Sequence, residues 1–535
     1  MGKKKPKTTA TRAKSAGPAA RVRMYRHGLG DCFLLSFPRT GQRDFRVLID
    51  CGIIQGTPKV DGQPDALERV VGDLKAATAE DGKPTIDVLV ATHEHWDHLA
   101  GFAELTAEFE TFAIGEVWLA WTEDPKNPTA TRLRQERAEK VNALKLGLAH
   151  ARQRLGADAT AEDDLDRVAE VLSFFGVDPD PDSDVGLGVS EDGDELFGVK
   201  GKPKLKVAEA MDWCRKVRPK NVHFWEPGRV IDLGGEVPGL RAFVLGPPTD
   251  LKQLTKDLPT KKGQETYEEH HLAAAGQAFF GADVGQGDGH NHEREFERSA
   301  PFDPKYRVSV DTAKGVEFYR THYFGTGCGA GEPWRRIDAA GLAGASAFAL
   351  KLDNDTNNTS LALAFELGDG RVLLFPGDAQ VGNWESWHAD AGGQERVWKV
   401  EKAGDAPERA VTAADLLART VVYKVGHHGS HNATLRGKGL ELMTHPDLVA
   451  LVPVDVYVAH EKKHWRQMPF DPLMEALRRQ TSGRVIVADQ TVADIKPESP
   501  FPGAVKDSDD AITVEGEDRK AVTRPLWVEY SVPGS

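Results

Sequence analysis

The 535-residue chain contains few cysteines and no long apolar run. Its four cysteines, Cys32, Cys51, Cys214 and Cys328, form no Cys-x-x-Cys pair. This excludes a disulfide framework and is typical of a reducing compartment. No apolar run approaches the roughly 18 residues that span a bilayer, and no apolar signal segment follows the basic N-terminus. The sequence therefore predicts a cytoplasmic protein without a membrane span, in which histidine and carboxylate hold any metal.

Positively charged residues are also fewer than negatively charged ones. Lys and Arg total 68 against 82 Asp and Glu, a net charge of -14. This argues against a broad basic surface that binds nucleic acid non-specifically, although it leaves room for a local basic groove. The exception is residues 1–22, which are basic and are predicted to form a disordered tail. The alternative is an arm that touches nucleic acid.

Apolar segments with strand character fall into two groups along the chain. The first group ends near residue 122, and the second begins with "SAFALKL" at 346–352 and "TSLALAFEL" at 359–367. Charged helical patterns fill about 125–220, and an irregular segment fills about 255–340. That segment contains His290 and His292, which we interpret as surface-loop residues because no strand or acid frames them. Two packed sheets with helices outside them fit this order.

The segment "ATHEHWDHLAGF" at 91–102 concentrates groups that bind metals. It follows the apolar run "TIDVLVAT" and precedes a helical pattern, so it occupies a strand-to-helix loop. Imidazole and carboxylate are the ligands that suit zinc and similar ions. His93 and His95 lie two residues apart and can reach one ion, while Asp97 and His98 can face a second. The alternative is a helix start capped by Asp97 among surface histidines.

Two later segments offer partners for this loop. "LLFPGDAQ" places Asp378 just after a buried strand, and "VVYKVGHHGS" places His427 and His428 after another. A carboxylate at Asp378 has two oxygens with which to bridge two metals. Taken alone, Asp378 reads as a turn aspartate and the histidines as capping or core residues. Together, the three segments each place a ligand at the carboxyl end of a core strand.

These motifs resemble the metallo-β-lactamase fold superfamily and, within it, the soluble relatives of the hydrolase domain of ComEC, the DNA-uptake channel protein. Further matching motifs are "GLGDC" at 28–32, "NNTSLALAF" at 357–365 and "KVGHHGS" at 424–430. The resemblance covers about 24–122, 222–248 and 345–495. It implies an α/β fold, a four-layer αββα sandwich with metals at one edge. Residues 23–535 would form this hydrolase domain, with a helical insertion at about 125–220 and an irregular one at about 255–340.

The resemblance also implies residue roles. His93 and His95 would bind the first metal, and Asp97 and His98 the second. Asp378 would bridge the two, and His427 would complete the second site. We prefer His427 to His428 as the ligand because it is the first polar group past the strand.

Other implied roles surround the ligands. Asp97 would also orient the attacking hydroxide, and His428 would serve as a catalytic proton donor, with His464 as an alternative. Asp50 would orient a ligand histidine. Asp31 and Asn358 would also hold the ligands in place without binding a metal themselves.

One departure from the superfamily concerns the first metal. Many members supply a third histidine before the strand of Asp378, but residues 346–362 contain none. Asn357 or Asn358 falls near that place, as asparagine does in the ComEC relatives. An amide oxygen is a weaker ligand, so the sequence leaves open whether one or two ions bind.

The implied chemistry is hydrolysis by a metal-bound hydroxide, with zinc as the expected ion and manganese as the alternative. The ComEC resemblance favours a phosphodiesterase or nuclease, with nucleic acid as the leading substrate. One alternative is hydrolysis of a small phosphodiester, a phosphorylcholine-type ester or a lactone. A second is a non-catalytic or partner-dependent metal-binding module.

Overall fold

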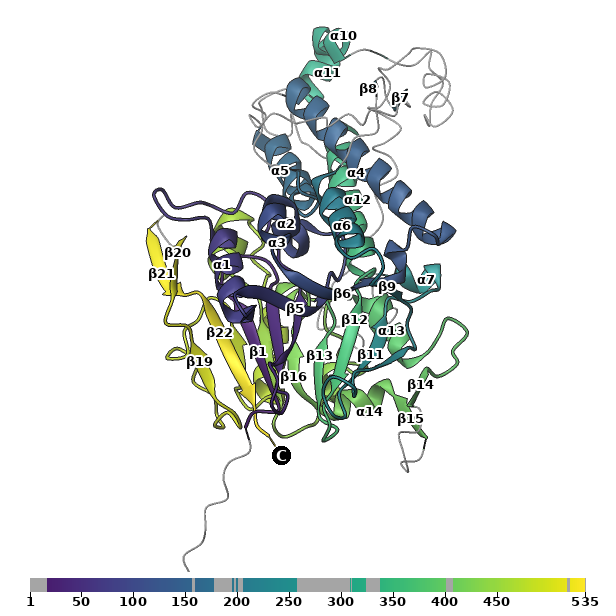
Figure 1. The fold of residues 1–535 in the computed structure, drawn as a ribbon. Helices are drawn as coiled ribbons and strands as arrows, with labels where there is room; N and C mark the ends of the chain where they lie inside the picture. Colours follow the sequence, from purple (N-terminus) through teal and green to yellow (C-terminus); the bar gives the residue numbers. More distant parts are fainter. Residues whose placement is uncertain are drawn as a thin grey trace, which may run out of the picture.

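Two facing β-sheets form the centre of the protein in the computed structural model (Figure 1). The structure describes residues 17–155, 159–177, 195–196, 199–200, 205–256, 308, 310–323, 337–400, 408–516 and 520–534. The predicted tail residues 1–16, the predicted loop histidines His290 and His292, and Cys328 lie outside these ranges.

The first sheet contains the strands of the N-terminal group, closed at one edge by strands from the end of the chain. Its order is β19-β22-β1-β2-β3-β5-β6-β9, and the short β4 pairs with β5. Strands β3, β5, β6 and β9 run parallel. The bounds are β1 Ala20–Tyr25, β2 Phe33–Phe37, β3 Phe45–Ile49, β4 Ala79–Glu80, β5 Lys83–Val90, β6 Ala113–Ala120, β9 Val222–Trp225, β19 Val505–Asp507 and β22 Trp527–Val532.

The second sheet contains the later strands in the order β10-β11-β12-β13-β16-β17-β18. Strands β13, β16, β17 and β18 run parallel, so their carboxyl ends meet at one edge of the sheet. The bounds are β10 Val230–Asp232, β11 Arg241–Gly246, β12 Ala362–Glu366, β13 Val372–Phe375, β16 Thr420–Lys424, β17 Val449–Val452 and β18 Val485–Val487.

Alternate residues of both sheets meet in a buried apolar layer between them. Phe33, Leu35 and Phe37 of β2 face this layer and contact the second sheet, where Phe375 lies 5.6 Å from Phe33 between ring centroids. The intervening Leu34 faces the outer helices. Because a strand alternates its side chains, apolar residues at both parities bury both faces.

Helices cover the outer faces of the sandwich (Figure 1). Those next to the first sheet are α1 Ala66–Thr78, α2 Trp96–Glu104, α3 Thr106–Phe109 and α6 Lys206–Val217; those next to the second are α13 Val381–His388, α14 Ala413–Ala418 and α15 Asp471–Gln480. This confirms the predicted αββα sandwich. Among the described residues, no helix combines the length and apolarity needed to cross a membrane.

Three longer helices stand together at one end of the sandwich (Figure 1). They are α4 Pro128–Leu155, α5 Ala159–Ser173 and α12 Ile337–Asn357, and each contacts the other two. The first two lie in the segment predicted as a helical insertion. The last one spans the predicted boundary at residue 340.

Minor elements complete the described chain. They are the 3-10 turns η1 Trp121–Glu123, η4 His427–Gly429 and η5 Leu440–Leu442, the π-helical turn η6 Val458–Lys462, the short helices α7 Leu251–Leu254, α10 Val310–Gly315 and α11 Glu317–His322, and the ribbons β7 Glu195–Leu196 with β8 Val199–Lys200, β14 Val397–Val400 with β15 Arg409–Thr412, and β20 Ala511–Glu515 with β21 Ala521–Pro525.

Two local predictions differ from the structure. The strand predicted at 346–352 is wrong, because these residues lie inside α12. "SAFALKL" alternates apolar residues over a few positions, but the helix continues well past it on both sides. The tail boundary at residue 22 is also wrong, because β1 begins at Ala20 and pairs with β22 from Val532 to Trp527.

Candidate metal centre

The segment 91–98 leaves the sandwich where β5 ends and α2 begins. His95 occupies the position before the helix, and its side chain makes no capping hydrogen bond. The loop after β3 holds this turn closely. A Cβ added at Gly52 would lie 2.2 Å from Asp97 C and from His98 N. Glycine at this position therefore allows two backbone segments to meet and places the side chains of Asp97 and His98 at the sheet edge.

Four buried side chains converge there from three strand ends. The ligand atoms of Asp97, His98, Asp378 and His428 all lie within 4.8 Å of one another. His98 Nε2 is 3.1 Å from Asp378 Oδ2 and 3.6 Å from Asp97 Oδ2. His428 Nε2 is 2.8 Å from the same Asp97 oxygen. Segments 280 and 331 residues apart in the sequence thus form one group of two imidazoles and two carboxylates.

Hydrogen bonds fix the orientation of both imidazoles. His98 Nδ1 lies 2.7 Å from Asp50 Oδ2, and His428 Nδ1 lies 2.6 Å from the carbonyl oxygen of Pro453. Because a carbonyl only accepts, His428 Nδ1 donates this hydrogen bond, and Nε2 is the ring atom that faces the cluster. In the same way, His98 Nδ1 donates to the carboxylate of Asp50, and His98 Nε2 faces the cluster. This pairing of one nitrogen with an acceptor is typical of metal-ligating histidines.

His427 is placed differently from His428. Its backbone N–H donates to Asp378 Oδ1 at 2.9 Å, and its ring Nδ1 lies 3.4 Å from Gln380 Nε2. Its ring is absent from the four-residue cluster. Both histidines have positive φ, 44° and 51°, in the left-handed region that non-glycine residues rarely adopt. This backbone turn directs the second ring of the pair, rather than the first, into the cluster.

Negative charge dominates the buried centre. Asp31, Asp50, Asp97 and Asp378 are all at most 2% exposed. Lys424, a buried lysine beside them, places Nζ 2.5 Å from Asp31 Oδ2 and 2.8 Å from Asp378 Oδ1. A single ammonium therefore faces several carboxylates in a site that excludes water.

The pKa shifts follow from this imbalance. Burial opposes protonation of His98, but Asp378 and Asp97 outweigh it and raise the His98 pKa well above its ordinary value. Burial opposes ionisation of Asp378, yet Lys424 and His98 hold its pKa well below the usual range. The field at the cluster thus draws positive charge. Asp97 Oδ1 and Asp31 Oδ1 are also buried without a hydrogen-bond partner. Nitrogen and oxygen donors with this charge fit a divalent cation.

A second compact donor group consists of Asp31, Asp50 and His98. His93 and His95 lie beside the four-residue cluster but belong to neither group. His93 Nε2 is 3.0 Å from His95 Nδ1, and His93 Nδ1 is 3.1 Å from Thr92 Oγ1. Burial lowers the pKa of His95 to about 3 and that of His93 well below its usual value. Both imidazoles are therefore neutral, the form that binds metals.

Residues after α5 and in α12 cover the candidate metal centre. The ring centroid of Phe174, just past α5, is 5.4 Å from that of His95 and 6.2 Å from that of His427. Phe175 lies 5.0 Å from His95, and Phe174 stacks on Trp465 at 5.0 Å. As a result, the six predicted ligands are each at most 6% exposed. From the same side, Asp353 of α12 brings Oδ1 to 3.6 Å from His95 Nε2.

The remaining predicted residues have separate places. Asn358 is buried and accepts backbone N–H groups of Gln380 and Asn383 at 3.1 and 3.2 Å, so it braces the loop after β13. His464 is exposed. Glu94, inside the histidine motif, contacts Arg137 of α4 and takes no part in the cluster.

Sequence reasoning missed three residues of the site: Thr92, Asp353 and Lys424. Lys424 carried a usable signal, since a lysine inside the apolar strand "TVVYKV" has to be paired when buried. Asp353 had a weaker one, because it lies four residues before Asn357, which places both on one face of a helix. Thr92 carried none, because threonine is common at strand ends.

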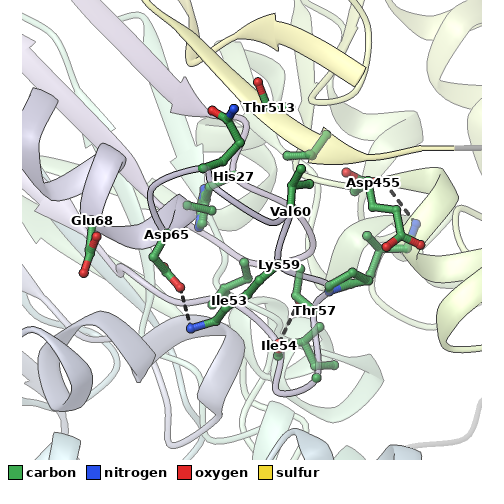
Figure 2. Close-up of a pocket in the computed structure, with 18 of the residues that line it drawn as sticks. His27, Ile53, Ile54, Thr57, Lys59, Val60, Asp65, Glu68, Asp455 and Thr513 are labelled. Carbon is green, nitrogen blue, oxygen red and sulfur yellow. Dashed lines mark hydrogen bonds and ion pairs between the residues drawn. The ribbon is translucent and has the colours of Figure 1, made fainter. Parts of the chain in front are cut away.

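A separate cavity of about 380 Å³ has Trp96 among its lining residues, and Figure 2 shows it in close-up. His27, Ile53, Val60 and Asp455 are among its lining residues, and the ion pair of Lys59 with Asp65 lies at its wall. None of the six predicted ligands lines it. This cavity is therefore distinct from the metal centre.

Residues 27–200 match the family model described as the metallo-beta-lactamase superfamily. The matched range includes the histidine motif at 93–98, while Asp378 and His428 lie beyond it. No curated protein matches the chain. The match, the sandwich and the buried donor cluster together indicate a hydrolase that depends on a divalent metal.

Proposed function

We propose that the protein is a metal-dependent phosphodiesterase. The observation that carries this proposal is the convergence of Asp97, His98, Asp378 and His428 at the carboxyl ends of core strands, with all ligand atoms within 4.8 Å. The resemblance of the motifs to the ComEC relatives supports a phosphodiester as the substrate class. Zinc suits these nitrogen and oxygen donors, and manganese is the alternative.

The structure supports one change in the residue roles. His428 directs Nε2 into the cluster, so we assign it as the ligand, in place of His427. Asp97, His98, Asp378 and His428 would then hold one ion, and His93 and His95 would face the other position. When bound, divalent ions lower the pKa of water towards neutrality and neutralise charge on a phosphate.

The chain's own groups would then position the reactants. Asp97 Oδ1, buried and free of hydrogen bonds among the described residues, would accept a proton of the attacking water. The Gln380 amide faces His427 Nδ1, which leaves the proton of this imidazole on Nε2. This N–H could donate a hydrogen bond to the leaving oxygen. Lys424 would hold Asp378 ionised and in place.

The enclosure of the centre favours a second candidate, a hydrolase of small phosphodiesters, phosphorylcholine-type esters or lactones. Phe174 and Trp465 stack directly above the histidines, and the donors are buried beneath them. A duplex about 20 Å wide would need its backbone to reach below this roof. A small diester or a strand end meets no such obstacle.

The test combines metal analysis with an activity screen. Purified protein should hold one to two equivalents of zinc or manganese and hydrolyse bis(p-nitrophenyl) phosphate, single-stranded DNA or RNA. Asp97→Ala and Asp378→Ala should each lose at least about 100-fold in rate, whereas Asp61→Ala, at an exposed position, should keep it. Protein that binds no metal after reconstitution would refute the proposal.

The same screen separates the alternatives. Cleavage of small diesters without cleavage of DNA or RNA selects the small-substrate hydrolase. Strong lactonase activity with no diesterase activity removes the phosphodiesterase proposal. Stable metal binding without turnover of any substrate supports the non-catalytic module.

A further inference from the structure

The first metal position lacks the third histidine that the superfamily commonly supplies. His93 and His95 face each other there, and no further histidine occurs between 346 and 362. The structure brings a different donor to this place, from an element outside the matched range 27–200. It is Asp353, four residues before the end of α12.

The proton positions along this edge leave His95 Nε2 as an unpaired acceptor. Thr92 Oγ1 donates to Asp50 Oδ2 at 2.7 Å, so it accepts from His93 Nδ1. His93 Nε2 then carries a lone pair and accepts from His95 Nδ1 at 3.0 Å. A neutral imidazole has one proton, which is on Nδ1 here, so His95 Nε2 presents its lone pair.

Asp353 Oδ1 faces that lone pair at 3.6 Å. Both atoms are buried and have no hydrogen-bond partner among the described residues. Asn357 Nδ2 donates to the other carboxylate oxygen at 3.1 Å and fixes the group, while Asn357 Oδ1 is also without a partner. Two acceptors that face each other in a dry site repel, and a cation between them removes the repulsion.

The separation of these two atoms also suits a shared ion. Zinc lies about 2.0–2.2 Å from imidazole nitrogen and from carboxylate oxygen, so two such ligands of a tetrahedral ion are roughly 3.4 Å apart. The observed 3.6 Å matches this spacing without movement of the backbone. A direct hydrogen bond would be shorter, about 2.7–3.2 Å.

We propose that Asp353 is a metal ligand, which binds the first ion together with His93 and His95 in place of the missing histidine. Helix α12 is then part of the metal centre, with Asn357 as the residue that orients the ligand. This inference rests on the proposed metal-dependent function, because it requires that a divalent ion binds at the motif.

The variant that tests it is Asp353→Asn, which keeps the shape and the acceptor for Asn357 but removes the charge. The matched control is Asp355→Asn on the same helix. Its carboxylate forms an ion pair with Lys351, at a distance of 2.6 Å. Each protein is stripped of metal, titrated with Zn²⁺ or Co²⁺ alone, and analysed for bound equivalents, Co²⁺ absorbance and melting temperature.

We expect wild type and Asp355→Asn to bind the same number of ions. Asp353→Asn should bind one fewer, or bind it about 10- to 100-fold more weakly, with altered Co²⁺ bands. Its metal-free melting temperature should be unchanged or higher, because an unpaired buried carboxylate is removed. The rise in its melting temperature on adding Zn²⁺ should be smaller than in wild type.

Three outcomes distinguish a failure of this inference from a failure of the proposed function. Equal metal content and affinity in Asp353→Asn and wild type would overturn the inference while leaving the proposed function intact. A lower metal-free melting temperature with an unchanged gain from Zn²⁺ would show a purely structural role and would also overturn it. Wild-type protein that binds no ion would refute the proposed function itself.

Discussion

Lys424 offers the sharpest test of how the metal centre is held together. Its ammonium group donates to Asp31, to Asp378 and to the carbonyl oxygen of Gly377, at 2.5, 2.8 and 3.0 Å. The side chain is 2% exposed, and the two carboxylates outweigh burial and raise its pKa above the ordinary lysine value. The substitution Lys424→Met removes the charge but keeps most of the apolar volume.

The expected loss is large because two buried carboxylates lose their counter-ion. Removing one partner of a buried ion pair costs about 3–5 kcal/mol. The exposed pair of Lys59 and Asp65, at 2.7 Å with the Lys59 side chain 81% exposed, is the matched control. Its substitution Lys59→Met should cost at most about 1 kcal/mol. Bound zinc would compensate Asp378, so metal should recover part of the loss in Lys424→Met.

Urea unfolding followed by tryptophan fluorescence measures these differences in chelated buffer and with added Zn²⁺. We expect the free energy of unfolding to fall by about 3–5 kcal/mol in Lys424→Met without metal and by less with it. A loss within 1 kcal/mol of that in Lys59→Met would refute the reasoning. It would mean that the carboxylates are solvated or protonated, and that the site has no excess negative charge to attract a cation.

Three further predictions concern the backbone, the pH and the attacking water. Gly52→Ala should lower both stability and metal content, because the added Cβ would overlap the backbone of Asp97, whereas Gly72→Ala, in open space on α1, should be neutral or stabilising by up to about 1 kcal/mol. Melting temperatures and metal analysis compare the two, and equal behaviour would contradict the predicted overlap. Burial raises the pKa of Glu170 to about 7. The folded state then binds this proton more tightly than the unfolded chain, whose glutamate pKa is about 4.3, so the free energy of unfolding should fall as pH rises between these values. Urea midpoints should show this fall in wild type and a smaller one in Glu170→Gln, and parallel pH profiles would count against it. Asp97→Asn should slow diester hydrolysis by at least about 100-fold with unchanged secondary structure by circular dichroism, and retention of more than a tenth of the rate would exclude Asp97 as the proton acceptor.

The sandwich was predictable because its strands are buried on both faces. β5 and β13 read as continuous apolar runs, and their ends carry the polar residues that break the pattern. Parallel strands bring their carboxyl ends to one edge, so Asp378 and the 427–428 pair, which follow β13 and β16 of the second sheet, meet there. The histidine motif follows β5 of the first sheet, so its place beside them also depends on how the two sheets face each other.

Which histidine of the pair enters the cluster could not be predicted in the same way. His427 and His428 are adjacent, and both have positive φ, which few non-glycine residues adopt. In a regular strand the first polar residue past the end would point at the shared edge. Here the reversed backbone carries the ring of His428 there instead. The sequence contains no sign of that reversal, since histidine has no strong preference for it.

Asp353 escaped prediction because a short segment was interpreted without its surroundings. Residues 346–352 alternate apolar and small side chains, and this agrees with a strand over a few positions. The segment forms a helix because it packs on α4 and α5, elements that lie about 180 residues earlier. Tertiary contact outweighed the local pattern, as it does wherever helix and strand preferences are close.

The helices α4, α5 and α12 therefore cannot be treated as separate from the candidate metal centre. Each reaches the histidine loop through its own contact: Arg137 of α4 pairs with Glu94, Phe174 after α5 lies against His95, and Asp353 of α12 faces the same ring. Two of these contacts lie at His95 and the third at the neighbouring Glu94, whereas the proposed second metal position is built almost entirely from strand ends. A chain lacking α4, α5 and α12 would keep the donors of the proposed second position and lose the aromatic cover and the counter-charge at His95. It follows that differences in substrate between this protein and simpler sandwiches of the same fold should arise at His95 and its neighbours, where α4, α5 and α12 meet the sheets.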